Sequence, residues 1–403
     1  MKILTVCEGI WPPLVNMSGI SAIYQLQKAL ADLGFEIHVL TTKERHMGSS
    51  FQQWFESEKK DSNINFHCID LGFVKAVPKV NFYTSKLVPP FEVLRLHSKH
   101  RFSVIHEYSS SIILARRTAL YKSLLDVPVI HTLCTYSEGY LGSPRFSRNV
   151  GVDKIVCVTH DMEKILLNDG YSKNKIAYLP LGIDLRRFDG KNSGDTTSFV
   201  QKLPIPAGAQ VTLYVGLIEQ RKGIFTLAEA ASSIIKKNPD AFFVVASYPF
   251  SGNFYDYNQN KVKLTKFLHE RGVEGRFYFL DRIANIPLLM SIADVFVSPL
   301  TTLHGTLGYP LSLLEAMASG KAIVASKITG ITELIVNQQN GLLFSAENAP
   351  ELAEKVSILL SDKTMRRRLG TNAMNDVKKY DVKYIAKMLG KMYEGLKAND
   401  AVP

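Results

Sequence analysis

The sequence predicts an α/β fold with two domains, each built around a parallel sheet. Its 403 residues are enough for two domains of ordinary size. Residues 3–40 contain a strand, a loop, a helix and a second strand, and such a βαβ unit implies parallel strands joined by a right-handed crossover. The same alternation starts again after residues 189–210, which are rich in Gly, Pro, Ser, Thr and Asn. We therefore expect a linker between two domains.

The first domain is predicted to open with a short buried strand at residues 3–6. We interpret the N-terminal letters MKILTVCEG as this strand and not as a signal peptide. A helix follows over residues 20–33, where Ile23, Leu26, Leu30 and Leu33 fall on one face. Further strands are predicted after Gly34, at residues 36–40, 104–106, 127–131 and 155–158, with Thr159 capping the next helix.

The second domain is predicted from a continuous alternation of strands and helices. Its strands are expected at residues 211–215, 242–246, 277–280 and 294–297. Its helices are expected at residues 224–237, 261–271 and 286–292, and the tail after Pro350 is predicted to be helical. These elements place the linker at residues 191–209 and the second domain at residues 210–379.

Composition limits the class of protein. The chain is 46% hydrophobic and 21% charged, with a net charge of +11 that is spread over both halves. Such an excess favours anionic partners, namely nucleotides, phospholipid surfaces or nucleic acid. The four cysteines are far apart and form no C-x-x-C pair, which is typical of reduced thiols in a cytosolic protein. No apolar run approaches the length of a membrane span.

Residues 304–326, HGTLGYPLSLLEAMASGKAIVAS, contain the first candidate binding segment. Gly305, Gly308 and Pro310 form a loop that opens a helix, Gly320 ends that helix, and a buried strand follows. A helix start preceded by glycines offers N–H groups to a phosphate. Glu315, one turn further on, can accept hydrogen bonds from paired hydroxyls such as a ribose diol. The alternative is an ordinary helix with a half-exposed glutamate.

Residues 216–223, GLIEQRKG, form the second candidate. Arg221 and Lys222 follow a predicted strand and precede a helix, where an arginine fork and a lysine charge can clamp a diphosphate. The alternative is a solvated basic loop. In the first domain, Gly19 at the start of the first helix can let the backbone approach a phosphate, or it can simply make the turn.

These segments resemble motifs of the GT-B glycosyltransferases of the GT4 family. Residues 304–326 resemble E-x-F-G-x-x-x-x-E-A-M-A-x-G-x-P-V-V-A, with Glu315 at the second Glu and Leu307 at the first. Residues 216–223 resemble G-R-L-x-x-x-K-G, with Leu217 in place of the Arg. The opening Pro12-Pro13 with Ser18-Gly19 resembles P-P-x-x-G-G. His131–Thr135 resembles H-T-x-H-G, with Cys134 at the second His.

The resemblance implies a GT-B architecture, in which two Rossmann-like domains face a cleft. Residues 1–190 would form the acceptor-side domain, residues 210–379 the nucleotide-sugar domain, and a helix at about 380–397 would return to the first domain. Family members of this kind transfer a sugar with retention and without a metal, so we expect no cofactor. The implied donor-binding residues are Gly19, Gly216, Gly308, Leu311 and Glu315. Lys222 and Arg221 would neutralise the leaving diphosphate, and Cys134 and His106 would lie on the acceptor side.

Residues 73–101 are the candidate membrane-facing segment. Basic residues alternate there with apolar ones against one acid, Glu92, and such a stretch can lie on an anionic membrane. The alternative is a helix that faces the core and exposes a basic side. We expect a cytoplasmic protein in peripheral contact with the inner membrane face, acting on a saccharide or lipid-linked acceptor, with no nucleic acid partner.

Two further expectations concern metals and activity. His97 and His100 are spaced one helical turn apart but no acid joins them, so no metal site is expected. Leu217, Leu307 and Cys134 replace polar groups that the resemblance places near the donor. They favour a rival hypothesis, in which the protein is a binding or scaffold protein on a GT-B frame that has lost transfer activity.

Overall fold

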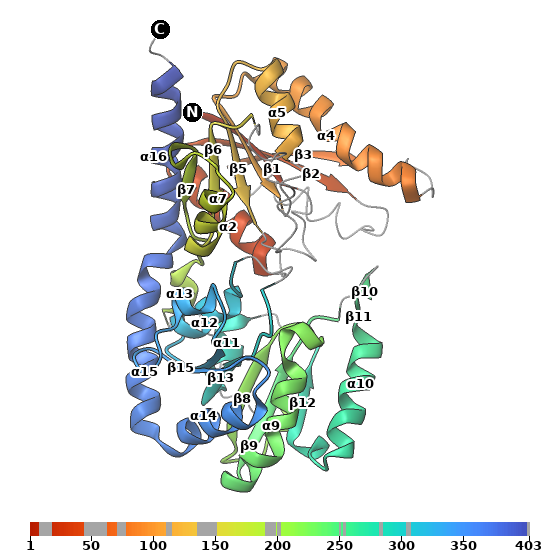
Figure 1. The fold of residues 1–403 in the computed structure, drawn as a ribbon, viewed down its shortest axis with the longest axis vertical. Coiled ribbons are helices and arrows are strands. Elements are labelled where there is room, and N and C mark those ends of the chain that lie inside the picture. Colours follow the sequence, from red (N-terminus) through yellow and green to blue (C-terminus); the bar gives the residue numbers. More distant parts are fainter. Residues whose placement is uncertain are drawn as a thin grey trace. The chain divides into compact units, whose positions relative to one another are not determined.

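The computed structural model divides the chain into two compact units (Figure 1). Unit 1 comprises residues 1–183, 304–308 and 380–403, and unit 2 comprises residues 184–303 and 309–379. The structure describes residues 1–7, 18–43, 63–70, 78–109, 115–134, 151–189, 199, 203–249, 251–252, 255–281, 285–303 and 308–400. Most of the predicted linker, the loop before Ser18, Leu307 and residues 71–77 and 135–150 lie outside the described residues.

Unit 1 is built on a parallel sheet. Among the described residues its strands are β1 (Lys2–Cys7), β2 (Glu36–Lys43), β3 (Ile64–Asp70), β4 (Val104–Ser109), β5 (Val129–Leu133), β6 (Lys154–Cys157) and β7 (Ile176–Tyr178). They lie in the order β3-β2-β1-β4-β5-β6-β7, and every neighbouring pair is parallel. The sheet therefore runs outward in two directions from β1 and β4.

The helices of unit 1 are α2 (Ser18–Asp32), α4 (Pro78–His100), α5 (Ala115–Leu124), α7 (His160–Asn168) and α16 (Val382–Asp400). Thr159 caps α7 as predicted, because its hydroxyl accepts a hydrogen bond from the Met162 N–H at 3.2 Å. Gly34 adopts a φ of 89°, which lets the chain leave α2 and enter β2. Helices α4 and α5 contact each other, as do α2 and α16 (Figure 1).

Unit 2 is built on a second parallel sheet, of β8 (Gln210–Val215), β9 (Ala241–Ala246), β12 (Phe277–Leu280), β13 (Val295–Ser298), β14 (Ala322–Ser326) and β15 (Leu342–Phe344). The described strands lie in the order β12-β9-β8-β13-β14-β15. A two-stranded antiparallel pair, β10 (Ser251–Gly252) and β11 (Tyr255–Asp256), stands apart from it. In order of sequence the main sheet reads 3-2-1-4-5-6, the strand order of a dinucleotide-binding Rossmann fold.

The helices of unit 2 are α9 (Ile224–Lys237), α10 (Tyr257–Glu270), α11 (Ile286–Ser291), α12 (Leu311–Ala318), α13 (Ile331–Leu334), α14 (Ala349–Ser361) and α15 (Lys363–Asp376). Helices α9 and α14 pack against each other (Figure 1), and α15 packs on α12 and β14. The central strands are buried on both faces, which is why β9 is an uninterrupted apolar run, AFFVVA.

The predicted α/β alternation is confirmed in both units. Helix α9 and strand β12 have the predicted bounds, and the other predicted elements shift by a few residues at their ends. Strand β3 was not predicted. It is the edge strand, and its sequence INFHCID places Asn65 and His67 outside the core, so the apolar signal is interrupted.

The C-terminal helix completes unit 1, as predicted. The N–H of Val382 bonds to the Ile183 carbonyl at 2.9 Å, which brings the chain to the start of α16. Tyr393, fully buried, packs edge-on against Phe35 with ring centroids 6.0 Å apart. Its hydroxyl lies 2.7 Å from Nδ1 of His106 on β4. A helix far along the chain is thus held to the first sheet by both packing and a buried hydrogen bond.

We predict that Tyr393→Phe destabilises the protein by about 1–3 kcal/mol, because it leaves a buried ring nitrogen of His106 without its partner. Urea denaturation followed by circular dichroism measures the change. Tyr384→Phe is the matched control, since Tyr384 lies on the same helix but is 54% exposed. Equal denaturation midpoints for the two variants would contradict the assignment.

Candidate functional site

The turn after β8 and the segment after β13 meet at the carboxyl edge of the unit 2 sheet. The turn comprises Gly216, a short 3₁₀ helix, η5 (Gln220–Lys222), and Gly223, whose φ is 74°. A Cβ at Gly223 would overlap the carbonyl oxygen of Pro299, so only glycine allows this close approach. The N–H of Thr301 donates to the Arg221 carbonyl at 3.1 Å. Because β8 and β13 are neighbours with diverging connections, this is where open α/β sheets place ligands.

Gly216 has a packing role in the same turn. The Tyr214 hydroxyl donates to the Leu217 carbonyl at 2.7 Å. A Cβ at Gly216 would lie 2.9 Å from that hydroxyl oxygen and crowd it. The missing side chain therefore allows the turn to fold over the end of β8.

Arg221 is already engaged within the protein. Its Nε and Nη2 donate to the two carboxylate oxygens of Glu219 at 2.8 and 3.0 Å. This two-point contact uses the face of the guanidinium that binds an anion most strongly. The hypothesis that Arg221 replaces the charge missing at Leu217 is therefore weakened, because an incoming diphosphate would compete with Glu219.

Lys222 differs from its neighbour. Within the part of the chain that the structure describes, its ammonium group makes no hydrogen bond or ion pair. Burial, together with the nearby charge of Arg221, lowers the pKa of Lys222 to about 8, although Glu219 opposes the change. A half-buried cation without a partner is suited to an anion supplied from outside.

Helix α12 is the first helix after β13 among the described elements, and β13 is the strand that pairs with β8. Pro310 is its N-cap and not its first helical residue, and the Leu313 N–H bonds back to the Pro310 carbonyl at 3.0 Å. The N–H groups of Leu311 and Ser312 have no acceptor among the described residues. The Leu311 side chain is buried, so any ligand contact there would use its backbone.

Glu315 lies on α12 among buried neighbours. Burial raises the pKa of Glu315 to about 7, and the positive charge of Arg187 lowers it only in part. No hydrogen bond to its carboxylate is found within the described residues. A half-buried acid in this state can accept hydrogen bonds from ligand hydroxyls.

Arg187 was missed by the sequence analysis. It belongs to a 3₁₀ helix, η4 (Leu185–Phe188), which contacts α12. Asp184 binds the neighbouring Arg186 at 2.8 and 2.9 Å, which distinguishes the two adjacent arginines. The sequence offered one indication of it, since the Arg-Arg pair follows the family-like segment IAYLPLGID after a single residue.

Two of the predicted donor-binding glycines, Gly19 of the first domain and Gly308 of the predicted second domain, both lie in unit 1. Gly19 is the second residue of α2, inside its first turn. Gly308 has a φ of 67° and belongs to unit 1 by its contacts, where a Cβ would lie 2.7 Å from Thr159 Cγ2. The donor-binding roles of both glycines stay predictions.

The predicted acceptor-side residues lie in the core of unit 1. His106 is fully buried, and its nitrogens lie within 2.7 Å of the Tyr393 hydroxyl and 2.6 Å of the Thr132 hydroxyl. Burial lowers the pKa of His106 to about 3 and raises that of the Cys134 thiol to about 12. Cys134 is 5% exposed and follows β5 directly. Both residues thus pack within the core of unit 1, and their acceptor-side roles stay predictions.

Two family models match the chain. The model described as Glycosyltransferase Family 4 matches residues 21–187, and the model described as Glycosyl transferases group 1 matches residues 195–376. Together they cover the elements of both sheets from α2 onward.

Curated relatives are glycosyltransferases of several kinds. The N,N'-diacetylbacillosaminyl-diphospho-undecaprenol alpha-1,3-N-acetylgalactosaminyltransferase of Campylobacter jejuni is 30% identical over 244 residues, 60% of each chain. The D-inositol 3-phosphate glycosyltransferase of Corynebacterium urealyticum is 26% identical over 66% of this chain and 65% of its own. The UDP-Gal:alpha-D-GlcNAc-diphosphoundecaprenol alpha-1,3-galactosyltransferase of Escherichia coli is 26% identical over 71% of this chain and 75% of its own. The chain thus spans less than two thirds of the first two relatives.

Solved structures share the fold over nearly the whole chain. A glycosyltransferase from Rickettsia africae matches with a TM-score of 0.80 at 17% identity, covering 99% of both chains. HepE from Anabaena, solved in complex with UDP, matches with a TM-score of 0.76 at 17% identity, covering 98% of this chain and 100% of its own. At this identity the likeness concerns the fold, and it confirms the GT-B prediction.

We predict that Glu315→Gln stabilises the protein at pH 8 but not at pH 4.5. The folded protein holds this proton up to about pH 7, whereas an unfolded glutamate releases it near 4.5, so the native glutamate loses stability as pH rises between those values. The gain at pH 8 should be about 3 kcal/mol. Thermal melts at both pH values measure it, with exposed Glu229→Gln on α9 as control. A difference independent of pH would contradict this.

Proposed function

The chain belongs to the glycosyl transferases group 1 (GT4) family and has the GT-B fold, and on that premise we propose that it transfers a sugar from a nucleotide-sugar donor to a lipid-linked or saccharide acceptor. We propose retention of the anomeric configuration and no requirement for a metal, as the family resemblance implies. The observation that carries the proposal is Lys222 at the carboxyl edge of the unit 2 sheet, which has no partner among the described residues.

Lys222 would stabilise the leaving nucleoside diphosphate. Charge grows on the leaving group as the bond to the sugar breaks, so a cation held in place before the reaction lowers the barrier as well as binding the donor. The phosphates would also face the helix start of α12, where the N–H groups of Leu311 and Ser312 are available. Binding of the diphosphate would supply the anion that Lys222 lacks, and would raise its lowered pKa.

Glu315 would recognise the ribose of the donor. Its carboxylate is half-buried, and a ribose diol offers two hydroxyl donors to two carboxylate oxygens. Arg187 would keep the carboxylate ionised when the ligand excludes water, because it already lowers the pKa of that group. HepE binds UDP in its solved complex, which supports a nucleoside diphosphate as the ligand class.

The acceptor would be a saccharide carried by a lipid diphosphate. The relatives from Campylobacter and Escherichia are both named for such acceptors, and this supports the same class here. The rival proposal is a GT-B protein that binds a donor without transferring it. Leu217 favours this rival, because a leucine replaces the arginine of the family motif and Arg221 is bound to Glu219.

We predict that Lys222→Met weakens nucleotide-sugar binding about 10- to 100-fold, the loss expected for one charge-assisted contact. Arg221→Met should change it little, because that guanidinium is held by Glu219. Thermal shift and calorimetry with UDP-, GDP- and dTDP-sugars measure binding, and donor hydrolysis measures turnover. Half-buried Lys321, whose ammonium donates to the Ala293 carbonyl at 3.0 Å, gives the control Lys321→Met.

The outcomes separate the proposals. If no sugar nucleotide shifts the melting temperature of the wild-type protein, the transferase proposal is wrong. Binding without hydrolysis or transfer would favour the rival. Equal losses in Lys222→Met and Arg221→Met would show that both cations serve the donor and would restore the role first predicted for Arg221.

Helix α4 supports peripheral membrane contact as a second part of the proposal. On its described side chains Val93 and Leu96 face the core, whereas Phe91 is 71% exposed and Arg95 and Lys99 are exposed. A basic helix with an exposed aromatic side chain suits an anionic surface. Glu92 binds Arg95 at 2.8 Å, which reduces the net positive charge. Among the described helices, none has the length and apolarity to cross a bilayer.

We predict that Phe91→Ser lowers binding to phosphatidylglycerol vesicles about tenfold, because it removes an apolar side chain from the interface. Vesicle sedimentation at low and physiological salt measures this, and added salt should weaken wild-type binding. Val262→Ser on α10 is the control, since Val262 is 68% exposed in unit 2. Binding that is indifferent to Phe91, or reduced equally by both substitutions, would contradict a role for α4.

A further inference from the structure

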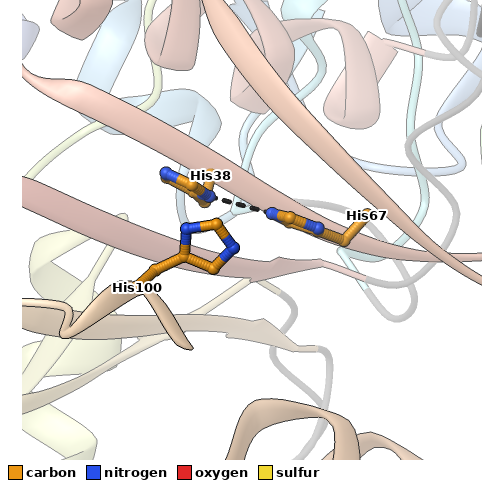
Figure 2. Close-up of side chains that lie close together, drawn as sticks. All are labelled: His38, His67 and His100. Carbon is orange, nitrogen blue, oxygen red and sulfur yellow. Dashed lines mark hydrogen bonds between the residues drawn. The ribbon is translucent and has the colours of Figure 1, made fainter. Parts of the chain in front are cut away.

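Three histidines of unit 1 gather at one edge of its sheet (Figure 2). His38 lies on β2, His67 on the edge strand β3, and His100 is the last residue of α4. In the parallel register Leu40 is opposite His67, so His38 and His67 point to the same face of the sheet. Arg101, with a φ of 54°, then turns the chain away from the helix. Residues from three separate elements thus present imidazole rings to one point.

The geometry of the cluster suits a small ligand. One ring nitrogen of each histidine lies within 4.8 Å of the other two. Nδ1 of His38 is 2.8 Å from Nε2 of His67, and the His100 ring centroid lies 4.6 Å from that of His38. Nε2 of His100 is buried and has no hydrogen-bond partner among the described residues. Burial removes the hydrogen bond that this nitrogen would make to water, and the lost bond costs folding free energy unless a further ligand binds.

Glu36 orients the most buried of the three rings. Nε2 of His38 donates to the Glu36 carboxylate at 3.1 Å, so the lone pair of that ring belongs to Nδ1, which faces His67. A histidine that binds a metal commonly donates its other N–H to a carboxylate in this way. The sequence analysis considered only His97 with His100 and found no acid, because His38, His67 and Glu36 reach the site through the sheet register.

We propose that His38, His67 and His100 bind one zinc ion or a closely related divalent transition metal. Three imidazoles suit zinc, nickel or copper, whereas calcium and magnesium prefer oxygen ligands. Zinc–nitrogen bonds of about 2.0–2.1 Å place tetrahedral ligand atoms roughly 3.3 Å apart. That value lies between the 2.8 Å contact and the 4.8 Å limit of the cluster, so small ring rotations bring the nitrogens into place. A fourth position is left for water or another ligand.

The ion would join three elements of unit 1. Among the described strands β3 pairs only with β2, and α4 contacts it. Coordination would tie both to β2, and metal that binds only the folded protein stabilises it by mass action. All three ligands lie in unit 1, whereas the proposed donor residues Lys222 and Glu315 lie in unit 2. The metal proposal is therefore independent of the proposed transfer activity.

Zinc binding to the full chain, purified without a polyhistidine tag and stripped with a chelator, tests the proposal. Equilibrium dialysis with elemental analysis should find one zinc ion per chain, and zinc should raise the melting temperature. Cobalt should give the visible absorption of a tetrahedral site. His67→Asn and His100→Asn should lose the stoichiometric ion, and Glu36→Gln should weaken affinity about 10- to 100-fold.

His97→Asn is the matched control, since His97 lies one turn earlier on α4, is also half-buried and is outside the cluster. It should bind zinc as the wild-type protein does. Circular dichroism of each chelated variant shows whether it folds, and the partly exposed His67 and His100 are preferred to buried His38 for this reason. Absence of stoichiometric zinc in the wild-type protein would overturn the proposal. So would equal zinc affinity in His97→Asn and in both ligand variants.

Discussion

In each parallel sheet the first strand lies in the interior, and the chain adds later strands on both of its sides. The other features depend on this topology. In unit 2 the chain leaves β8 toward β9 and returns to β13 on the other side, so two loops meet at one carboxyl edge. Both loops lie beyond the ends of the buried strands, so they can carry charge without disturbing the core. Gly223 makes the arrangement compact, because it lets one loop rest on the carbonyl of Pro299. The turn with Lys222 and the start of α12 are both consequences of this topology.

The charged side chains of unit 2 differ in whether the protein already satisfies them. Arg221 is held by Glu219 at the carboxyl edge of the sheet, and Lys321, just before β14, donates to backbone carbonyls at 3.0 and 3.3 Å. Lys222 and Glu315 are desolvated and have no such partners within the described ranges, and their shifted pKa values favour the neutral forms. Desolvation without compensation costs folding free energy, and proteins keep such groups where a ligand later supplies the partner. The unsatisfied charges therefore distinguish a binding site from a stabilising network.

The same distinction separates the buried histidines of unit 1. His106 bonds to two hydroxyls, and His131 lies 2.6 Å from the Ser109 hydroxyl. These rings replace apolar side chains in the core and are internally satisfied. His38, His67 and His100 instead face one another, with a carboxylate behind the first and a partnerless nitrogen on the last. Histidine is thus a core residue at positions 106 and 131, whereas the cluster of three offers nitrogen ligands.

The sequence by itself determined the fold class, because hydrophobic periodicity and turn residues are local signals. It placed α9 and β12 at their observed bounds, and motif order identified the family. It also selected Lys222 and Glu315, since each follows a recognisable loop.

Only the tertiary structure decided which of two adjacent cations is available, because the Arg221–Glu219 contact depends on side-chain geometry. It also decided that His106 and Cys134 are core residues, and that Arg187 and Glu315 are neighbours. The histidine cluster joins residues 38, 67 and 100, and a contact across that separation arises from strand register, which no local pattern records.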